Sequence, residues 1–216
     1  MKLVIFDLDG TLIDSRLDIA HSVNAMREHM NREPLPFETI YKGVGHGAPA
    51  LVRNALGPET SESDVQQGVA FFLDHYNRHA LDYTTLYPGV MESLERLRKA
   101  GKKMAVLTNK PTRTTLDIVE GLGAGDYFFQ VYGGDSLPFK KPSPVGIDRL
   151  REEAGAGRDG TVMVGDSSVD VQTARNAQVP CCAVTYGFQP ETLADPAPDV
   201  MVDRMEQVAD WVLSRQ

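Results

Sequence analysis

Cysteine is scarce in this chain of 216 residues, which has two, Cys181 and Cys182, side by side in an apolar stretch. Adjacent cysteines make an improbable structural disulfide, and the pair lacks the spacing of a zinc site. We therefore expect neither a disulfide framework nor a structural zinc, and we interpret both residues as small, buried side chains of a strand.

An excess of positive charge is also lacking, since 22 Lys and Arg residues face 30 Asp and Glu residues, for a net charge of −8. An acidic chain is a poor candidate for non-specific binding to nucleic acid or to an anionic membrane. Any bound phosphate therefore depends on cations gathered locally and not on the overall field of the protein.

Long apolar runs are missing as well, and no stretch approaches the roughly 20 residues that cross a bilayer. The apolar run at the N-terminus is short and is interrupted by Asp7, which is unlike a secretory signal. We expect a cytoplasmic protein with no membrane and no nucleic-acid partner; the sequence leaves open whether it is a monomer or a homodimer.

The most informative segment that is present is Asp7-Leu8-Asp9-Gly10-Thr11, which directly follows an apolar run. β-branched and aromatic residues in that run indicate a buried strand. Two carboxylates two residues apart at its end suit a nucleophile with an acid/base group beside it, and they leave room for a divalent cation. Asp and Gly are also common turn residues, so this interpretation needs support from the rest of the chain.

Three later segments give that support. Thr108 and Asn109 follow the apolar run at 104–107, and Asp166 follows the run at 162–164. Lys141 comes from a further loop, which opens a turn before a helical pattern. Because ligands of open parallel sheets lie beyond the carboxyl ends of the strands, we expect these polar groups to meet at one edge of a sheet.

The chain changes character twice along its length. Residues 15–85 show helical spacing and no convincing strand, with helices expected at about 17–26, 37–42, 48–56 and 65–81. From residue 86 onward strands alternate with helices, and we expect strands at 103–107, 129–133, 161–164, 181–184 and 200–202. Such alternation is typical of βαβ units and a parallel sheet.

We therefore predict an α/β fold, with a Rossmann-like parallel-sheet core made of residues 1–14 and 86–216. An all-helical cap domain of residues 15–85 is expected to be inserted after the first strand. The turn at 186–188, which follows the expected strand at 181–184, is predicted to lie beside the site.

Taken together, the chain resembles the haloacid dehalogenase superfamily of phosphotransferases. The match covers that family's four motifs in order: Asp7 and Asp9, then Thr108, then Lys141, then Asp166 with Asp170. Each motif by itself is weak, whereas four in the family order are highly specific. The resemblance implies a Mg²⁺-dependent phosphatase that acts through an aspartyl-phosphate.

The resemblance also implies the role of each acid. Asp7 is the expected nucleophile, and Asp9 is the expected acid/base that protonates the leaving alkoxide and then activates water. Asp7, the backbone carbonyl of Asp9 and Asp166 are the expected Mg²⁺ ligands. Asp170 either supports Mg²⁺-bound water or orients Lys141.

The remaining motif residues are expected to handle the phosphoryl group. Thr108 and the amide of Asn109 would hold its oxygens. Lys141 would neutralise its charge as a point charge. Thr108 and Lys141 therefore count as catalytic residues alongside the two acids.

Within the superfamily the chain looks most like the phosphoglycolate phosphatases, and this likeness runs nearly end to end. It departs from that group at His46, where Asn is common, and at Gln178, where a Gly usually ends the helix in the left-handed conformation. Cap residues are thought to select the substrate, so the first departure bears on substrate identity. Lys42, His46 and Arg53 are our candidates for cap groups that meet a substrate carboxylate.

Other readings of the activity stay open. Sugar phosphates, nucleoside monophosphates, pyrophosphate and muramic acid 6-phosphate are alternative substrates to 2-phosphoglycolate. A phosphosugar mutase would keep all four motifs.

Two other classes are disfavoured by the acids that are present. A dehalogenase would lack the second acid, and a catalytically dead binding module would have lost one of Asp7, Asp9 or Asp166; all three are present.

Overall fold

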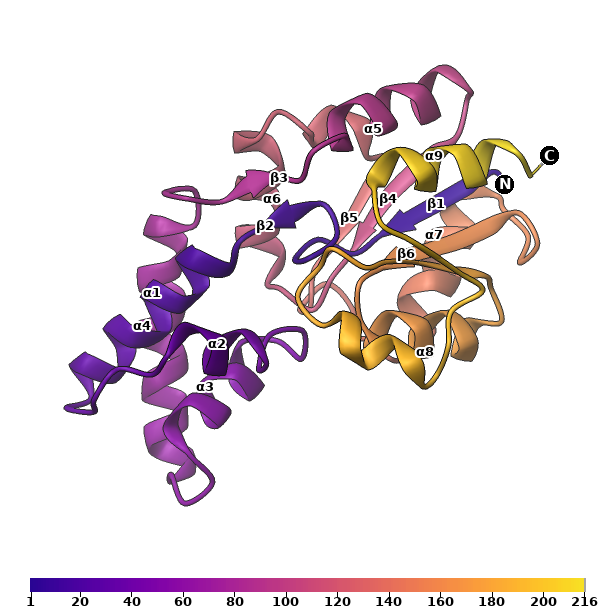
Figure 1. Cartoon of the computed structure of the whole chain (residues 1–216). Coiled ribbons are helices and arrows are strands. Elements are labelled where there is room, and N and C mark those ends of the chain that lie inside the picture. The colour runs from indigo at the N-terminus through magenta and orange to yellow at the C-terminus, as the bar shows by residue number, and fades with distance from the viewer. Residues whose placement is uncertain (216) are drawn as a thin grey trace. The chain divides into compact units, whose positions relative to one another are not determined.

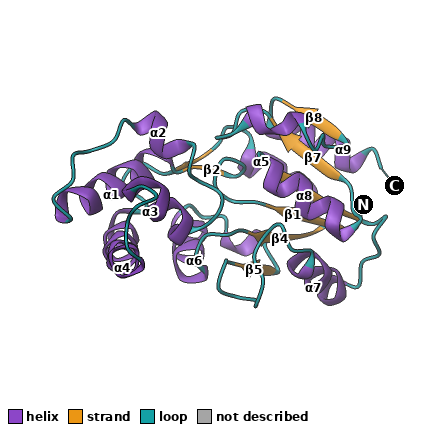
Figure 2. Cartoon of the chain, turned by 90° about the horizontal axis from the view of Figure 1, so that it is seen from below, coloured by secondary structure: helices purple, strands orange, loops and turns teal. Residues whose placement is uncertain are grey.

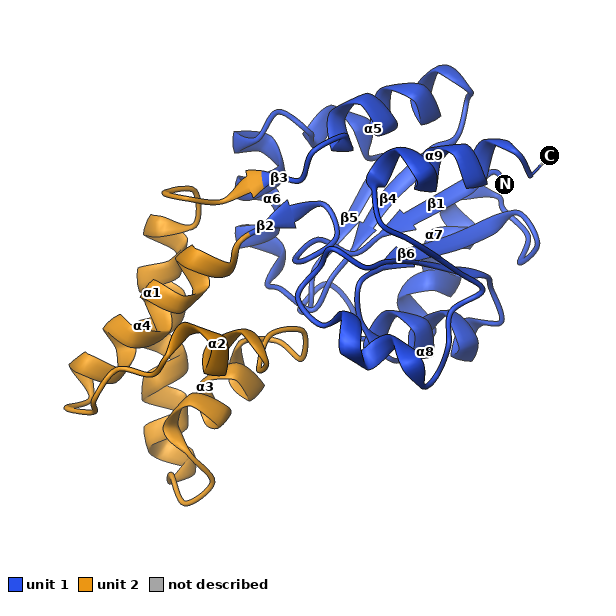
Figure 3. Ribbon diagram, viewed as in Figure 1, with its two compact units in different colours: residues 1–14, 86–216 blue, residues 15–85 orange. Residues whose placement is uncertain are grey.

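The computed structural model describes residues 1–215, and the chain divides into two compact units (Figure 3). One unit consists of Met1–Asp14 together with the chain from Leu86 onward, and the other is Ser15–Thr85. Two-residue strands, β2 (Ile13–Asp14) and β3 (Thr85–Leu86), pair where the chain passes between the units. No helix in the described part of the chain is long and apolar enough to cross a membrane.

The first unit is built on a six-stranded sheet in the order β5-β4-β1-β6-β7-β8, in which every neighbouring pair is parallel. Its strands are β1 (Leu3–Phe6), β4 (Lys103–Leu107), β5 (Gln130–Tyr132), β6 (Thr161–Gly165), β7 (Cys181–Val184) and β8 (Val200–Val202). The predicted α/β class with a Rossmann-like sheet is confirmed. Cys181 and Cys182 are free and buried in β7, as expected.

Helices cover both faces of this sheet. They are α5 (Val90–Lys99), α6 (Thr112–Gly121), α7 (Val145–Ala154), α8 (Ser168–Ala177) and α9 (Met205–Leu213), with 3₁₀ turns η1 (Gly125–Tyr127) and η2 (Pro190–Ala194). α5 packs on α9 over one face, and α7 packs on α8 over the other (Figure 1). Figure 2, seen from below, shows α8 in front of the strands.

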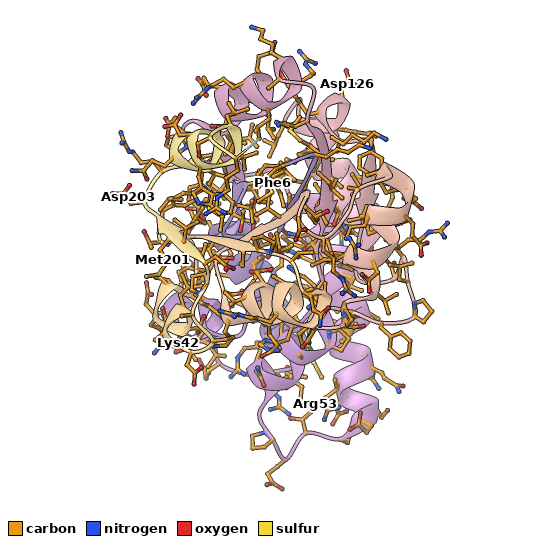
Figure 4. The ribbon with its side chains drawn as sticks, turned by 90° about the vertical axis from the view of Figure 1, so that its right-hand side faces the viewer. Phe6, Lys42, Arg53, Asp126, Met201 and Asp203 are labelled. Carbon is orange, nitrogen blue, oxygen red and sulfur yellow. The ribbon has the colours of Figure 1, made fainter. Side chains whose placement is uncertain are left out.

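Apolar spacing explains this packing. α7 buries Ile147, Leu150 and Ala154 at intervals of three and four residues, which puts one helical stripe on the sheet. The central strand β1 is buried along its whole length, as expected for a strand covered on both faces. Figure 4 shows Phe6 amid the packed side chains, whereas Asp126 and Asp203 lie at the periphery.

The strand order puts the point at which the connections change direction beside β1. From β1 the sheet extends through β4 to β5 on one side and through β6 to β8 on the other. Connections that leave in opposite directions open a gap at the carboxyl ends of the strands, and open α/β sheets bind their ligands in this gap.

The second unit contains four helices, α1 (Arg16–His29), α2 (Phe37–Tyr41), α3 (Ala48–Leu56) and α4 (Glu62–His79). α4 packs against α1 and α3, and Gly68 makes the close approach possible, because a Cβ there would lie 2.9 Å from Cγ1 of Val52. α4 is capped by Ser61, whose side chain accepts the Asp64 N–H at 3.1 Å. Ser15 occupies the cap position of α1, but its side chain makes no capping hydrogen bond.

Candidate active site

The site begins where β1 ends. The Asp7 N–H still donates to the Val164 carbonyl at 2.8 Å, so the ladder between β1 and β6 continues one residue past the strand. This hydrogen bond fixes the backbone of Asp7 at the carboxyl edge, and the residue is 7% exposed.

Three of the predicted acids meet a predicted lysine at this edge. Carboxylate oxygens of Asp7, Asp166 and Asp170 all lie within 4.8 Å of one another, and all three residues are buried. Nζ of Lys141 lies 2.8 Å from Oδ1 of Asp7 and 2.6 Å from Oδ1 of Asp170. The structure thus brings together groups that are up to 163 residues apart in sequence (170 − 7).

Asp166 is held in place from two loops. The Phe188 N–H donates to its Oδ2 at 2.7 Å, and Thr11 Oγ1 donates to its Oδ1 at 3.4 Å. A Cβ at Gly10 would lie 2.2 Å from Oδ2 of Asp166, and a Cβ at Gly187 would lie 2.3 Å from its Cβ. Two glycines therefore leave room for this carboxylate. The turn after β7 lies beside the site, as predicted.

Asp170 reaches the cluster from the first turn of α8. Its Oδ2 accepts the N–H of Ser167 at 3.2 Å and the Ser167 hydroxyl at 2.8 Å, while Oδ1 accepts from Lys141. A Cβ at Gly165 would lie 2.2 Å from Cγ of Asp170, so the backbone approaches this side chain closely. Of the two roles expected for Asp170, the contact that orients Lys141 is present.

Thr108 and Asn109 follow β4, where the Thr108 N–H donates to the Tyr132 carbonyl at 3.0 Å. The side-chain amide of Asn109 clamps the backbone of Lys141: Nδ2 donates to the Lys141 carbonyl at 3.1 Å, and Oδ1 accepts the Lys141 N–H at 3.0 Å. The contact of Asn109 with phosphoryl oxygens stays a prediction. Because the side-chain amide is bonded to Lys141, we assign that contact to the main-chain amide of Asn109.

Asp9 has a separate partner that the sequence did not indicate. Nζ of Lys110 lies 2.6 Å from Oδ1 of Asp9, and the two side chains are 5% and 13% exposed. No sequence pattern predicts this pair, because its two residues are 101 positions apart and come from the loops after β1 and β4.

The predicted cap residues lie in the second unit. Lys42 and His46 are exposed in the segment between α2 and α3. Arg53, on α3, forms an ion pair with Glu62 at 2.6 Å, with its side chain 41% exposed. Arg53 is therefore already engaged by a carboxylate of its own unit.

Comparisons with known proteins agree with this geometry. The sequence model of the haloacid dehalogenase-like hydrolases matches residues 4–184. The chain belongs to this family. A phosphoglycolate phosphatase of Pseudomonas syringae pv. syringae is 38% identical over 212 residues, covering 96% of this chain and 78% of that protein. A phosphoglycolate phosphatase of Vibrio vulnificus is 36% identical over 220 residues, covering 99% of this chain and 96% of the relative.

Solved structures show the same architecture. A predicted phosphoglycolate phosphatase from Haemophilus somnus matches with a TM-score of 0.92 and 31% identity, covering 100% of this chain and 98% of the other. One from Lactobacillus delbrueckii subsp. bulgaricus matches with a TM-score of 0.91 and 28% identity, covering 98% of each chain. The expected family and the expected phosphatase class of enzyme are confirmed.

The charges of the site of this haloacid dehalogenase-like hydrolase are unbalanced. Burial raises the pKa of Asp7 to about 7, even though Lys141 opposes the shift, and the neighbouring Asp170 adds to it. Burial also raises the pKa of Asp166 well above its usual range, with Asp170 and Asp7 contributing. Burial opposes the charge on Lys141, but Asp170 and Asp7 together raise its pKa above the usual value. Asp7 and Asp166 therefore favour a neutral form unless more positive charge is present.

A divalent cation fits this donor set. The clustered groups are carboxylate oxygens, which are the hard ligands that Mg²⁺ prefers. Oδ1 of Asp7 is buried and accepts no well-aligned hydrogen bond, although Lys141 Nζ lies 2.8 Å away. When all four acids are ionised, the two lysines leave two negative charges, which one divalent cation would balance.

Proposed function

We propose that this protein is a Mg²⁺-dependent phosphomonoester hydrolase that works through an aspartyl-phosphate on Asp7, with 2-phosphoglycolate as its leading substrate. The observation that carries the mechanism is the buried cluster of Asp7, Asp166 and Asp170 around Lys141 at the carboxyl edge of the sheet. A phosphate dianion repels a carboxylate that attacks it, so the reaction needs cations close by, such as Lys141 and a metal ion bound by the acids.

In the first half-reaction a carboxylate oxygen of Asp7 attacks phosphorus. The bond between phosphorus and the ester oxygen breaks, and its electron pair goes to that oxygen. Asp9 donates a proton to the departing oxygen, so the alcohol leaves neutral. Asp7 then carries the phosphoryl group as an acyl phosphate.

In the second half-reaction Asp9, now a carboxylate, takes a proton from water. The resulting hydroxide attacks phosphorus, the bond to the Asp7 oxygen breaks, and phosphate leaves. Asp7 is restored as a carboxylate and Asp9 as an acid, so the proton balance closes over the cycle.

The other residues handle charge. Lys141, fixed by the Asn109 clamp and by Asp170, presents a cation to the transferring group. The Thr108 hydroxyl and the main-chain amide of Asn109 would hold phosphoryl oxygens. Asp7, the Asp9 carbonyl and Asp166 would hold Mg²⁺, which would supply charge neutralisation for both nucleophile and phosphate.

The substrate assignment is supported by the names of the relatives. Proteins 36% to 38% identical over nearly all of this chain are called phosphoglycolate phosphatases. Sugar phosphates, nucleoside monophosphates, pyrophosphate and muramic acid 6-phosphate are the alternatives to exclude. We propose a role for the unit 15–85 as the cap that selects among them.

The first test is phosphate release from a panel of these monoesters with Mg²⁺, with and without EDTA. We expect 2-phosphoglycolate to have the highest kcat/KM, EDTA to abolish turnover, and Asp7→Asn to abolish it as well. Asp126→Asn, the same change at an exposed acid, serves as the matched control and should keep full activity.

The outcomes separate mechanism from substrate. If another ester has the highest kcat/KM while the dependence on metal and on Asp7 holds, the mechanism stands and the substrate name is wrong. If no ester is hydrolysed, the result favours a phosphosugar mutase, and the next assay is phosphosugar isomerisation with a bisphosphate primer.

Recognition of the substrate carboxylate is tested in the cap. Lys42→Ala and His46→Ala should raise KM for 2-phosphoglycolate with little change in kcat, because they would remove binding shared by ground state and transition state. Arg53→Ala should change KM less, because this guanidinium is already paired with Glu62. An unchanged KM in all three variants would remove these residues from substrate binding.

A further inference from the structure

Two lysines pair with three of the four carboxylates of the site. Lys141 contacts Asp7 and Asp170, which belong to the cluster that suits a cation. Lys110 contacts Asp9. Among the described residues, the cluster consists of Asp7, Asp166 and Asp170 and does not include Asp9. The carboxyl group expected to move protons therefore lies apart from the carboxyl groups expected to hold metal.

Lys110 is fixed by its own turn. Its N–H donates to Oγ1 of Thr108 at 3.3 Å, and its carbonyl accepts the Gly134 N–H at 2.7 Å. A Cβ at Gly133 would lie 2.7 Å from that carbonyl oxygen, so the loop after β5 packs tightly on this turn. A rigid backbone and a side chain that is 5% exposed give the ammonium group little freedom.

We propose that Lys110 is the positioning residue of the acid/base Asp9, holding its carboxyl group out of the cation-binding cluster and reserving it for proton transfer to the leaving oxygen. The proposal rests on the proposed function. Nζ of Lys110 lies 2.6 Å from Oδ1 of Asp9, which fixes the position of this carboxyl group. Without the ammonium group of Lys110, the carboxylate of Asp9 would be drawn toward the bound cation as an additional ligand.

This role has a kinetic signature that depends on the leaving group. The phenol of p-nitrophenyl phosphate is acidic and leaves without a proton, whereas an alkyl alkoxide needs one. Since kcat/KM reports the steps up to the formation of the aspartyl-phosphate, loss of a positioned acid lowers it most for alkyl esters. A purely structural role would lower kcat/KM for all esters alike.

The experiment measures kcat/KM with saturating Mg²⁺ for p-nitrophenyl phosphate, phenyl phosphate and 2-phosphoglycolate. Lys110→Met should lose at least about tenfold more with the alkyl ester than with p-nitrophenyl phosphate, because a general acid contributes roughly 10²- to 10⁴-fold. Lys110→Arg should recover much of the loss. Lys103→Met, the same change at the exposed amino end of β4, should leave the ratio unchanged.

Asp9→Asn separates the acid/base role of Asp9 from the positioning role of Lys110. It should show the same leaving-group dependence as Lys110→Met, and adding Lys110→Met to it should deepen that dependence little, because one residue acts through the other. If Asp9→Asn is insensitive to the leaving group, the acid/base role in the proposed function fails. If Asp9→Asn discriminates and Lys110→Met does not, only the role of Lys110 is overturned.

Folding of the variants is followed by thermal unfolding. Should Lys110→Met fail to fold, Lys110→Gln provides the second uncharged variant, since it keeps a hydrogen-bond donor in the same pocket. An equal loss of kcat/KM across the three esters for the folded uncharged variant would contradict the proposal.

Discussion

Gln178 occupies a backbone position that suits glycine better. It ends α8 with φ at 56°, and with Asn31 it is one of two non-glycine residues in the described chain that have a positive φ. The resemblance to the phosphoglycolate phosphatases implies that a Gly usually stands at this helix end. Gln178 adopts the left-handed conformation that glycine favours. An L-residue in this conformation costs about 1 kcal/mol or more.

We therefore predict that Gln178→Gly stabilises the protein. Relief of the left-handed strain exceeds the extra chain entropy of glycine by roughly 0.5–1 kcal/mol, or about 1–4 °C in Tm. Gln178→Ala is the matched control, because it also removes the hydrogen bond from Arg158 yet keeps the strained φ. Equal Tm values for the two variants would show that backbone strain is not the cause.

At the residue scale, motif positions were predictable and their partners were not. Asp7, Asp166 and Lys141 were recognised because each follows a strand or a turn in the family order, and the structure brings them together. Lys110 carried no such signal. A lysine in a loop is usually solvated, and its burial against Asp9 depends on two strands that only the sheet brings together.

At the element scale, the turn after β7 is expected to tune metal affinity. A Cβ at Gly187 would lie 2.4 Å from Oδ2 of Asp166, so Gly187→Ala must displace that carboxylate. We expect Gly187→Ala to weaken Mg²⁺ binding about tenfold or more, as loss of support behind a metal ligand commonly does. Isothermal titration calorimetry with Mg²⁺ alone measures this without reference to turnover.

The control for this change is Gly157→Ala, because a Cβ at Gly157 meets nothing within 4 Å. Gly157→Ala should bind Mg²⁺ as the wild type does. Equal affinities for both variants and the wild type would mean either that Asp166 is no ligand or that the turn moves away without cost.

Element type was predictable, whereas short pieces were missed. Helical spacing located the four helices of residues 15–85, and apolar runs located the six strands of the large sheet. Their ends are displaced by a few residues; α4, for example, begins at Glu62 and not at residue 65. β2 and β3 were missed because two residues show no periodicity. The 3₁₀ turns η1 and η2 were missed for the same reason.

At the scale of the whole molecule, alternation of strands and helices predicted a parallel sheet but not its order. Periodicity reports which residues are buried, and it carries no information on which strands are neighbours. The order β5-β4-β1-β6-β7-β8 comes from the three-dimensional packing, and it brings the loops after β1, β4 and β6 to one edge. The site residues could therefore be named from the sequence, while their contacts needed the structure.

The buried acids couple folding to pH and to metal. The pKa of Asp7 rises from 3.8 to about 7 on folding, with burial as its main cause, so the metal-free folded state binds a proton that the unfolded state releases. The stabilisation from this proton is complete below about pH 4 and is lost as pH rises toward about 7. Asp166 acts in the same direction. We therefore expect Tm in EDTA to fall as pH rises through this window.

Magnesium should reverse that trend, because it binds the carboxylates only when they are deprotonated. The rise in Tm on adding Mg²⁺ should be larger at pH 8 than at pH 6. Asp7→Asn should flatten the fall of Tm in EDTA, because it removes a carboxyl group whose pKa burial raises to about 7. Asp126→Asn should retain the wild-type slope. Parallel Tm profiles for the wild type and Asp7→Asn would mean that Asp7 is already ionised in the metal-free protein, and that Lys141 outweighs burial in setting its charge.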